Sequence, residues 1–204
     1  MTSSEIARCG ISNAKLLLMD ARKMEFADSS FDFVTAGFVG WSGSYDFKSF
    51  KFKRRARGLE EITRVLKQGG KAGFTGWTIQ EDSDLVKELV RTHLQESPSR
   101  VKRNTRSVRD AYSRETPEGW RNLLSALGFE AVRIKEETRE ITYADEEEWW
   151  KAILDAGWRE EIRRLGGKTI QSGLRRDTSR ALADHRDDRG IHFRRSVVYA
   201  LGTK

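Results

Sequence analysis

The sequence predicts an α/β fold in which strands and helices alternate along the first 80 residues. Continuous apolar residues at 15–19 predict a short buried strand, and the β-rich segment at 31–36 predicts a second one. Leucine, isoleucine and valine recur at helical spacing over 59–66, and residues 71–77 then predict the next strand. Strands joined through a helix pair in parallel. A strand at 195–201 is expected to be the antiparallel last member of this sheet.

Glycines mark the expected ends of the first helices. A helix at 3–9 is expected to stop at Gly10, and the helix at 59–66 is expected to stop at Gly69 and Gly70. Glycine adopts the left-handed backbone that commonly follows a helix, so it ends helices in many folds.

We expect a single domain over residues 1–204, with a variable and mostly helical cap within it over 82–190. No internal repeat or low-complexity linker interrupts the chain. Helical patterns fall at 85–94, 108–112, 120–127, 146–154 and 170–185, and short strands are expected at 132–134 and 141–143.

The composition is that of a folded protein that dissolves in water. Hydrophobic residues make up 37% of the chain, and no window approaches the roughly 18 consecutive apolar residues of a membrane-spanning helix. The N-terminus lacks the charged and apolar regions of a signal peptide, so we expect a cytoplasmic protein without a membrane span. Cys9 is the only cysteine, which excludes an intramolecular disulfide and a zinc site built from cysteines.

The charge is strongly basic, with 38 Lys and Arg against 31 Asp and Glu, giving +7. Basic stretches lie at 48–71 and 100–114, whereas 136–148 is acidic. Two interpretations stay open: solvated surface, or binding of an anionic partner such as nucleic acid. Rings that could stack on bases within the first basic stretch and beside it are Phe47, Phe50 and Phe52.

Three motifs occur in a fixed order, namely D-A-R-K-M-E-F at 20–26, D-S-S-F-D-F-V-T-A at 28–36 and L-E-E-I-T-R-V-L-K-Q-G-G-K at 59–71. As a set they resemble class I S-adenosylmethionine-dependent methyltransferases, particularly type 11 methyltransferases and the ubiquinone and menaquinone C-methyltransferases. The resemblance covers residues 5–80 and, more loosely, the terminal strand at 194–202. It implies a Rossmann-like sheet, with 82–190 as the substrate-side region.

The resemblance implies a site for S-adenosylmethionine beyond the carboxyl ends of the strands, where open parallel sheets hold their ligands. The carboxylate of Asp20 would accept a hydrogen bond from the adenine amino group, and the N–H of Ala21 would meet a ring nitrogen. Met24 and Phe26 would line the adenine face.

The methionine part of the cofactor would lie beside Ala36 and Gly37, by the same resemblance. Trp41 and Trp77 fall at the same edge of the expected sheet and are candidate substrate-binding residues. Aromatic rings there suit an apolar or planar acceptor, and core packing explains both tryptophans equally well.

No residue is assigned a catalytic role. Methyl transfer depends mainly on holding the nucleophile in line with the methyl group, so a dedicated base is optional. For an oxygen or nitrogen acceptor, the candidates for a base are His93, Tyr112 and His185. No H-E-x-x-H, P-loop, S-x-x-K or metal-ligand cluster occurs, so metal-dependent hydrolysis and phosphoryl transfer lack support.

The family's Gly-rich G-x-G-x-G turn does not occur in this sequence, and neither does the strand-ending acid that binds the ribose. The expected sheet is therefore N-terminally incomplete by at least one βαβ unit, on the order of 30 residues. Three explanations stay open: a shortened form of a normal enzyme, a protein whose second copy or partner chain completes the sheet, and a noncatalytic relative.

The predicted function is S-adenosylmethionine-dependent methyl transfer to a small organic acceptor. The alternatives are a noncatalytic methyltransferase-like subunit or truncated form that needs a partner, and an RNA-binding or RNA-modifying protein.

Overall fold

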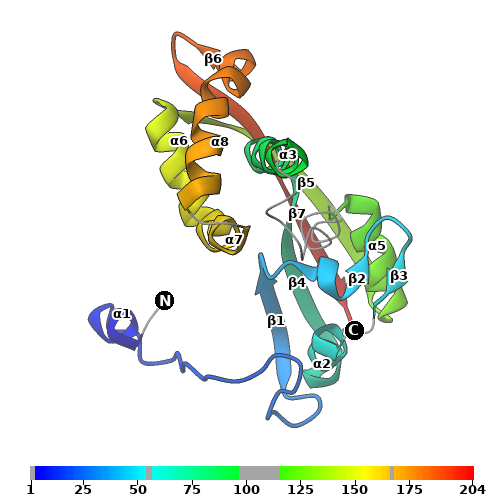
Figure 1. Cartoon of the computed structure of the whole chain (residues 1–204). Helices are drawn as coiled ribbons and strands as arrows, with labels where there is room; N and C mark the ends of the chain where they lie inside the picture. Colours follow the sequence, from blue (N-terminus) through cyan, green and yellow to red (C-terminus); the bar gives the residue numbers. More distant parts are fainter. Residues whose placement is uncertain (1–2, 54–56, 97–114, 166–167) are drawn as a thin grey trace.

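A five-stranded sheet forms the centre of the protein (Figure 1). The computed structural model describes residues 3–53, 57–96, 115–165 and 168–204. The strands of the sheet are β1 (Phe31–Gly37), β4 (Leu66–Gln80), β5 (Glu130–Tyr143), β6 (Arg186–Asp187) and β7 (Gly190–Thr203). Their spatial order is β1-β4-β7-β5, and β6 pairs with β7.

The strand directions confirm the predicted α/β architecture. β1 and β4 run parallel, with Val34 opposite Ala72 and Gly37 opposite Thr75, and helix α2 (Arg57–Val65) lies between them in the sequence. β7 is antiparallel to both β4 and β5. The C-terminal strand is therefore the antiparallel member that the sequence predicts.

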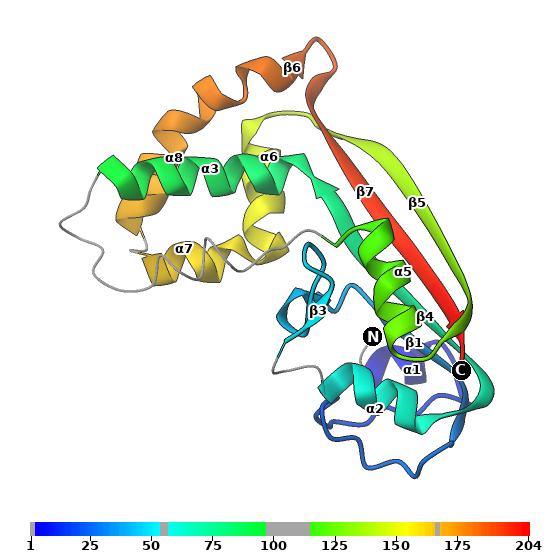
Figure 2. The same ribbon diagram turned by 90° about the vertical axis from the view of Figure 1, so that its right-hand side faces the viewer.

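One face of the sheet is covered by α2 and by α5 (Pro117–Ala126) (Figure 2). A short segment after β1 also packs there, formed by η1 (Trp41–Gly43), β2 (Tyr45–Asp46) and β3 (Lys51–Phe52). The core of this layer includes Leu59 and Ile62 of α2 and Leu123 and Leu124 of α5, all nearly or fully buried. Apolar residues at helical spacing point from each helix to the sheet, which is why these segments fold as they do.

A second group of helices packs near the carboxyl end of β4. It consists of α3 (Glu81–Glu96), α6 (Glu146–Ile153), the π-helical turn η2 (Leu154–Trp158), α7 (Arg159–Leu165), α8 (Lys168–Ala181) and η3 (Ala183–His185) (Figure 2). Trp149, Trp150 and Trp158 are buried in its core together with Phe193 of β7. The helical cap expected within 82–190 is present, and the same range also supplies β5 to the sheet.

The opposite face of the sheet is open among the described residues. Phe33 of β1 is 68% exposed and Leu201 of β7 is 48% exposed, and both project from this face. A hollow of about 270 Å³ lies on this face beside Leu201, lined in part by Gly37, Gly73 and Tyr199. The outer edge of β1 likewise has no pairing strand in the described part of the chain.

The expected strand at 15–19 is absent, which makes that prediction wrong. Helix α1 (Ser3–Arg8) forms and ends before Gly10 as expected, but residues 14–20 then have no regular structure. The side chain of Leu18 is fully exposed, and those of Leu16 and Leu17 are about half exposed. A strand requires a partner for its backbone groups, and the apolar run finds none here.

Two other boundaries differ from the predictions. Helix α2 ends at Val65, and the following strand already contains Gly69 and Gly70. The two short strands expected at 132–134 and 141–143 are one continuous strand, β5, which pairs with β7 along its length. Its charged side chains interrupt the apolar alternation, so the pattern alone divides it. The helix expected at 108–112 lies outside the described residues.

No helix in the described part of the chain is both long and apolar enough to cross a membrane.

Candidate active site

The carboxyl ends of β1 and β4 meet at one edge of the sheet. Gly37 is the last residue of β1, and the N–H of Phe38 donates to the carbonyl oxygen of Thr75 at 2.9 Å. The chain then turns through Gly40, which has a φ of +76°, into the η1 turn that begins at Trp41. Ligands of open parallel sheets bind beyond such strand ends.

A buried carboxylate lies on the helix-covered side of this edge. Glu115 directly precedes Thr116, whose side chain caps α5 by accepting from the N–H of Gly119. Oε1 of Glu115 accepts from the backbone N–H of Trp41 at 2.8 Å, and Oε2 of Glu115 accepts from the indole Nε1–H of Trp120 at 3.1 Å. The carboxylate thus joins the loop after β1 to the start of α5.

Strand β4 leaves room for this carboxylate at Gly76. A Cβ at that position would lie 1.7 Å from Oε2 of Glu115, closer than any real contact. Glu115 is 5% exposed, and burial raises the pKa of its carboxyl, opposed by the hydrogen bonds from Trp41 and Trp120. The carboxyl therefore retains a proton to a higher pH than an exposed glutamate does.

The neighbouring residue Trp77 faces the other side of β4, because successive strand residues alternate. Its ring lies 4.6 Å from that of Phe38, and the guanidinium carbon of Arg195 lies 5.9 Å from its centroid. Arg195 in turn donates to the fully buried Asp82, and the Tyr143 hydroxyl donates to the same carboxylate at 2.7 Å. Burial, followed by this hydrogen bond, raises the pKa of Tyr143.

The predicted adenine-side residues begin with Asp20 on the loop before β1. Its carboxylate accepts from the backbone N–H of Arg22 at 2.9 Å and from that residue's guanidinium, which holds the pKa of Asp20 at about 2. Half of the side chain is exposed, so its oxygens can still accept from a ligand amino group. The carbonyl of Ala21 and the ring of Trp41 both lie beside Gly58 at the start of α2.

Met24 and Phe26 belong to the loop before β1 and contact the second half of α2, away from the carboxyl ends of the strands. The N–H of Met24 donates to Glu61 at 2.7 Å, and Arg64 donates to the carbonyl oxygens of Met24 and Phe26. The Phe26 ring packs on Phe31 at the first residue of β1, with ring centroids 4.8 Å apart. The structure therefore brings Ala21 close to the carboxyl edge and leaves Phe26 at the amino end of β1.

The residues predicted to contact the methionine part of the cofactor and the acceptor lie on both sides of the sheet. Ala36 and Gly37 are at the carboxyl end of β1 and line the hollow on the open face. Trp41 is 5% exposed, and its ring packs on Phe74 within the core. Trp77 is only partly buried, so it is the more accessible of the two candidate substrate-binding tryptophans.

Other candidate groups lie elsewhere. His185 stacks on Phe193 at 4.3 Å, far along β7 from the carboxyl end of β1. Tyr112 and the side chain of His93 lie outside the described residues. No group of three or more potential metal ligands occurs in the part of the chain that the structure describes.

The three rings predicted as possible stacking partners for nucleic-acid bases differ in their exposure. Phe47 is 1% exposed and packs on Tyr45 and Trp120, so it is not available for stacking on a base. Phe50 and Phe52 are partly exposed, and the basic stretch at 100–114 lies outside the described residues.

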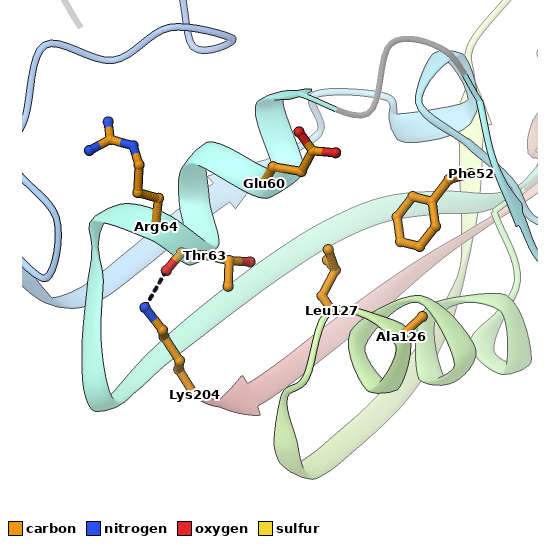
Figure 3. A pocket seen from close by; sticks show the side chains of 7 residues that line it. All are labelled: Phe52, Glu60, Thr63, Arg64, Ala126, Leu127 and Lys204. Carbon is orange, nitrogen blue, oxygen red and sulfur yellow. Dashed lines mark hydrogen bonds between the residues drawn. The ribbon is translucent and has the colours of Figure 1, made fainter.

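A separate groove of about 470 Å³ runs between α2 and α5 (Figure 3). It lies toward the amino end of β4, where Lys204 donates to the carbonyl oxygens of Thr63 and Leu66 at 2.7 and 2.8 Å and so caps the C-terminus of α2. Figure 3 shows its lining residues, Phe52, Glu60, Thr63, Arg64, Ala126, Leu127 and Lys204. None of them is a predicted site residue.

Sequence reasoning missed Glu115, Asp82 and Arg195. Each is a single charged residue without a motif, and each has at least one partner that is more than 60 residues away in the sequence. Only the buried strand and helix contacts show that these charges lie inside the protein.

Comparison with known proteins finds one matching family model and several similar structures. Residues 2–74 match the family model described as "Methyltransferase domain". The structure resembles the YcgJ protein from Bacillus subtilis, with 21% identity, a TM-score of 0.55, and coverage of 99% of this chain and 76% of that one. The described part of this chain therefore has a Rossmann-like α/β fold similar to the fold of that protein. A candidate methyltransferase from Bacillus halodurans is similar at 18% identity and a TM-score of 0.54, over 98% of this chain and 76% of that one.

The match over residues 2–74 agrees with the resemblance that the three motifs carry, and the similar structures share the α/β fold that the resemblance implies. A search of curated proteins finds no match to this sequence.

Proposed function

We propose that this protein transfers a methyl group from S-adenosylmethionine to a small organic acceptor at the carboxyl ends of β1 and β4. The observation that carries the proposal is the parallel β1 and β4 pair, within which Ala36 and Gly37 end β1 at the expected ligand edge. All of β1 and residues 66–74 of β4 lie within the segment that matches the methyltransferase model.

The residues of the loop before β1 fit the adenine end of the cofactor. The half-exposed carboxylate of Asp20 has oxygens that can accept from an amino group, and Ala21 lies near the same edge. When bound, the cofactor supplies an electrophilic methyl group on a sulfonium. This chain's own contribution is to hold the acceptor, exclude water and orient its nucleophile. We propose the partly buried Trp77 as a wall of the acceptor site, and Trp41 as a buried residue that holds the loop after β1 at the same edge.

The outer edge of β1 is the place for a further strand. Among the described residues its backbone groups have no pairing strand, and an edge of this kind readily accepts another chain. We propose that a second copy or a partner chain adds its strand there and completes the ligand site beside Gly37.

Calorimetric titration with S-adenosylhomocysteine tests the function directly. We expect binding in the micromolar range that Asp20→Ala weakens by about 1 kcal/mol, roughly fivefold, because one hydrogen-bond acceptor is lost. Asp188→Ala removes an exposed acid from the turn between β6 and β7 and serves as the matched control. The proposal fails if no heat is detected at millimolar ligand, or if Asp20→Ala and Asp188→Ala bind equally well.

A further inference from the structure

Glu115 is buried, and no opposite charge lies against it among the described residues. No Lys, Arg or His forms an ion pair with it in the described part of the chain, and only two neutral N–H groups donate to its oxygens. Each carboxylate oxygen has two lone pairs, so both can accept a further donor. A buried carboxylate is costly unless it is paired, and this one is only partly compensated.

Two buried donors in the same cluster also have no partner. Trp41 Nε1–H and Tyr45 Oη–H are completely shielded from solvent and make no hydrogen bond within the described structure. Both side chains belong to the core layer that contains Trp120 and Phe74. Buried polar groups in native proteins are usually satisfied, so these atoms indicate a polar ligand or water in this region.

The walls around the carboxylate are aromatic. Trp120 lies 5.1 Å from Phe74 and 5.5 Å from Phe47 between ring centroids, and Trp41 lies 6.0 Å from Phe74. These rings pack on one another and carry few polar atoms, so they do not compensate the charge of the carboxylate. An ammonium group would compensate it better than a neutral or anionic group would.

The place of this cluster in the fold connects it to methyl transfer. Glu115 lies against Gly76 of β4 and holds the backbone of Trp41, four residues after β1 ends. We propose that Glu115 binds the acceptor and that the acceptor is a small amine, an inference that rests on the function proposed above.

The chemistry of an amine explains why a carboxylate is useful here. An ammonium nitrogen has no lone pair with which to accept a methyl group. When one proton passes to a Glu115 oxygen, an N–H bond breaks, an O–H bond forms, and the bonding pair stays on nitrogen as the lone pair. Both groups are then neutral, which suits a buried site.

Titration with matched probes tests this assignment on the full chain without cofactor. Benzylamine and propylamine provide ammonium groups, and benzyl alcohol is the uncharged match. We expect at least one amine to bind ten or more times more tightly than the alcohol. Glu115→Gln should remove that preference, whereas Glu118→Gln, which changes an exposed acid in the first turn of α5, should keep it. Failure of both amines to bind, or an unchanged preference in Glu115→Gln, overturns the proposal.

A second readout covers the case in which Glu115→Gln does not fold. In the unsubstituted protein, the indole Nε1–H signal of Trp120 in a ¹⁵N-labelled sample should shift with amine and not with alcohol. The indole signal of Trp149, which lies in the other core cluster, should not shift. Equal shifts at both indoles, or none at Trp120, would contradict the assignment.

Parallel titration with S-adenosylhomocysteine separates the two proposals. Cofactor-product binding without amine binding leaves the methyltransferase function standing and overturns the amine acceptor. Amine binding without cofactor-product binding supports the Glu115 site and counts against the methyltransferase function.

Discussion

Replacing Asp82 with alanine should destabilise the protein more than the same replacement of an exposed acid would. Asp82 is fully buried in the first turn of α3 and accepts from Arg195 Nε at 3.0 Å, from Arg195 Nη2 and from the Tyr143 hydroxyl at 2.7 Å. Its Oδ1 also accepts from the N–H of Ser83. The carboxylate therefore ties α3 to the end of β5 and to β7, and its removal leaves the Arg195 charge partly buried without this counterion.

The size of the effect follows from this geometry. Breaking a buried ion pair from one side costs about 3–5 kcal/mol. The Arg195 side chain is 24% exposed and can recover some water, so we expect the lower end, about 3 kcal/mol. For a chain of this size, that corresponds to a fall in Tm of roughly 6–12 °C. Replacing Arg195 with methionine in the same chain should recover part of the loss, because no buried charge then remains.

Urea unfolding followed by circular dichroism measures these differences, and Asp155→Ala is the matched control. Asp155 pairs with Arg159 on an exposed helical surface, where both side chains are more than half exposed. Such a pair contributes about 0.5 kcal/mol or less. Equal losses for Asp82→Ala and Asp155→Ala, or a double variant with Arg195→Met that is less stable than Asp82→Ala alone, would refute the reasoning.

Two further outcomes follow from the site and its supporting loop. Gly76→Ala should cost about 1–3 kcal/mol and weaken the Trp120 hydrogen bond, because the new methyl group displaces the Glu115 carboxylate; unchanged thermal melting and indole fluorescence would contradict this. Glu61 has a pKa of about 2, held low first by the Arg64 guanidinium and then by a backbone N–H. Its stabilising effect is present above its unfolded pKa of about 4.5 and is lost as pH falls toward 2. Glu61→Gln should therefore flatten the loss of stability between those values in urea unfolding, and an unaltered slope would contradict the prediction.

Periodicity predicted most of the elements because most of them bury a continuous apolar face. β1, α2, β4, α5 and β7 all form where the apolar spacing places them. The same reasoning failed at residues 15–19, where the apolar content is high but no strand offers backbone partners in the described structure. Composition measures the tendency to be buried, whereas a strand also needs a neighbour.

The candidate site was predictable only in part. Ala36, Gly37 and Trp77 follow from the rule that ligands gather beyond the carboxyl ends of strands. Glu115 does not follow from it, because its role depends on contacts with Trp41 and with Gly76, both far from it in the sequence. Phe26 packs on Phe31 at the amino end of β1, and its place at the adenine face stays a prediction.

The placement of β7 governs when the sheet can form during synthesis. β7 lies between β4 and β5, yet it is made after both of them and after the cap helices. Until β7 leaves the ribosome, β4 and β5 each have one edge whose backbone N–H and C=O groups lack the partners that β7 supplies. Chaperones or other nascent chains can reach these edges. Pairing between such distant parts of a chain is also intrinsically slow. Closure of the sheet is therefore a late, single event that joins both halves of the protein at once.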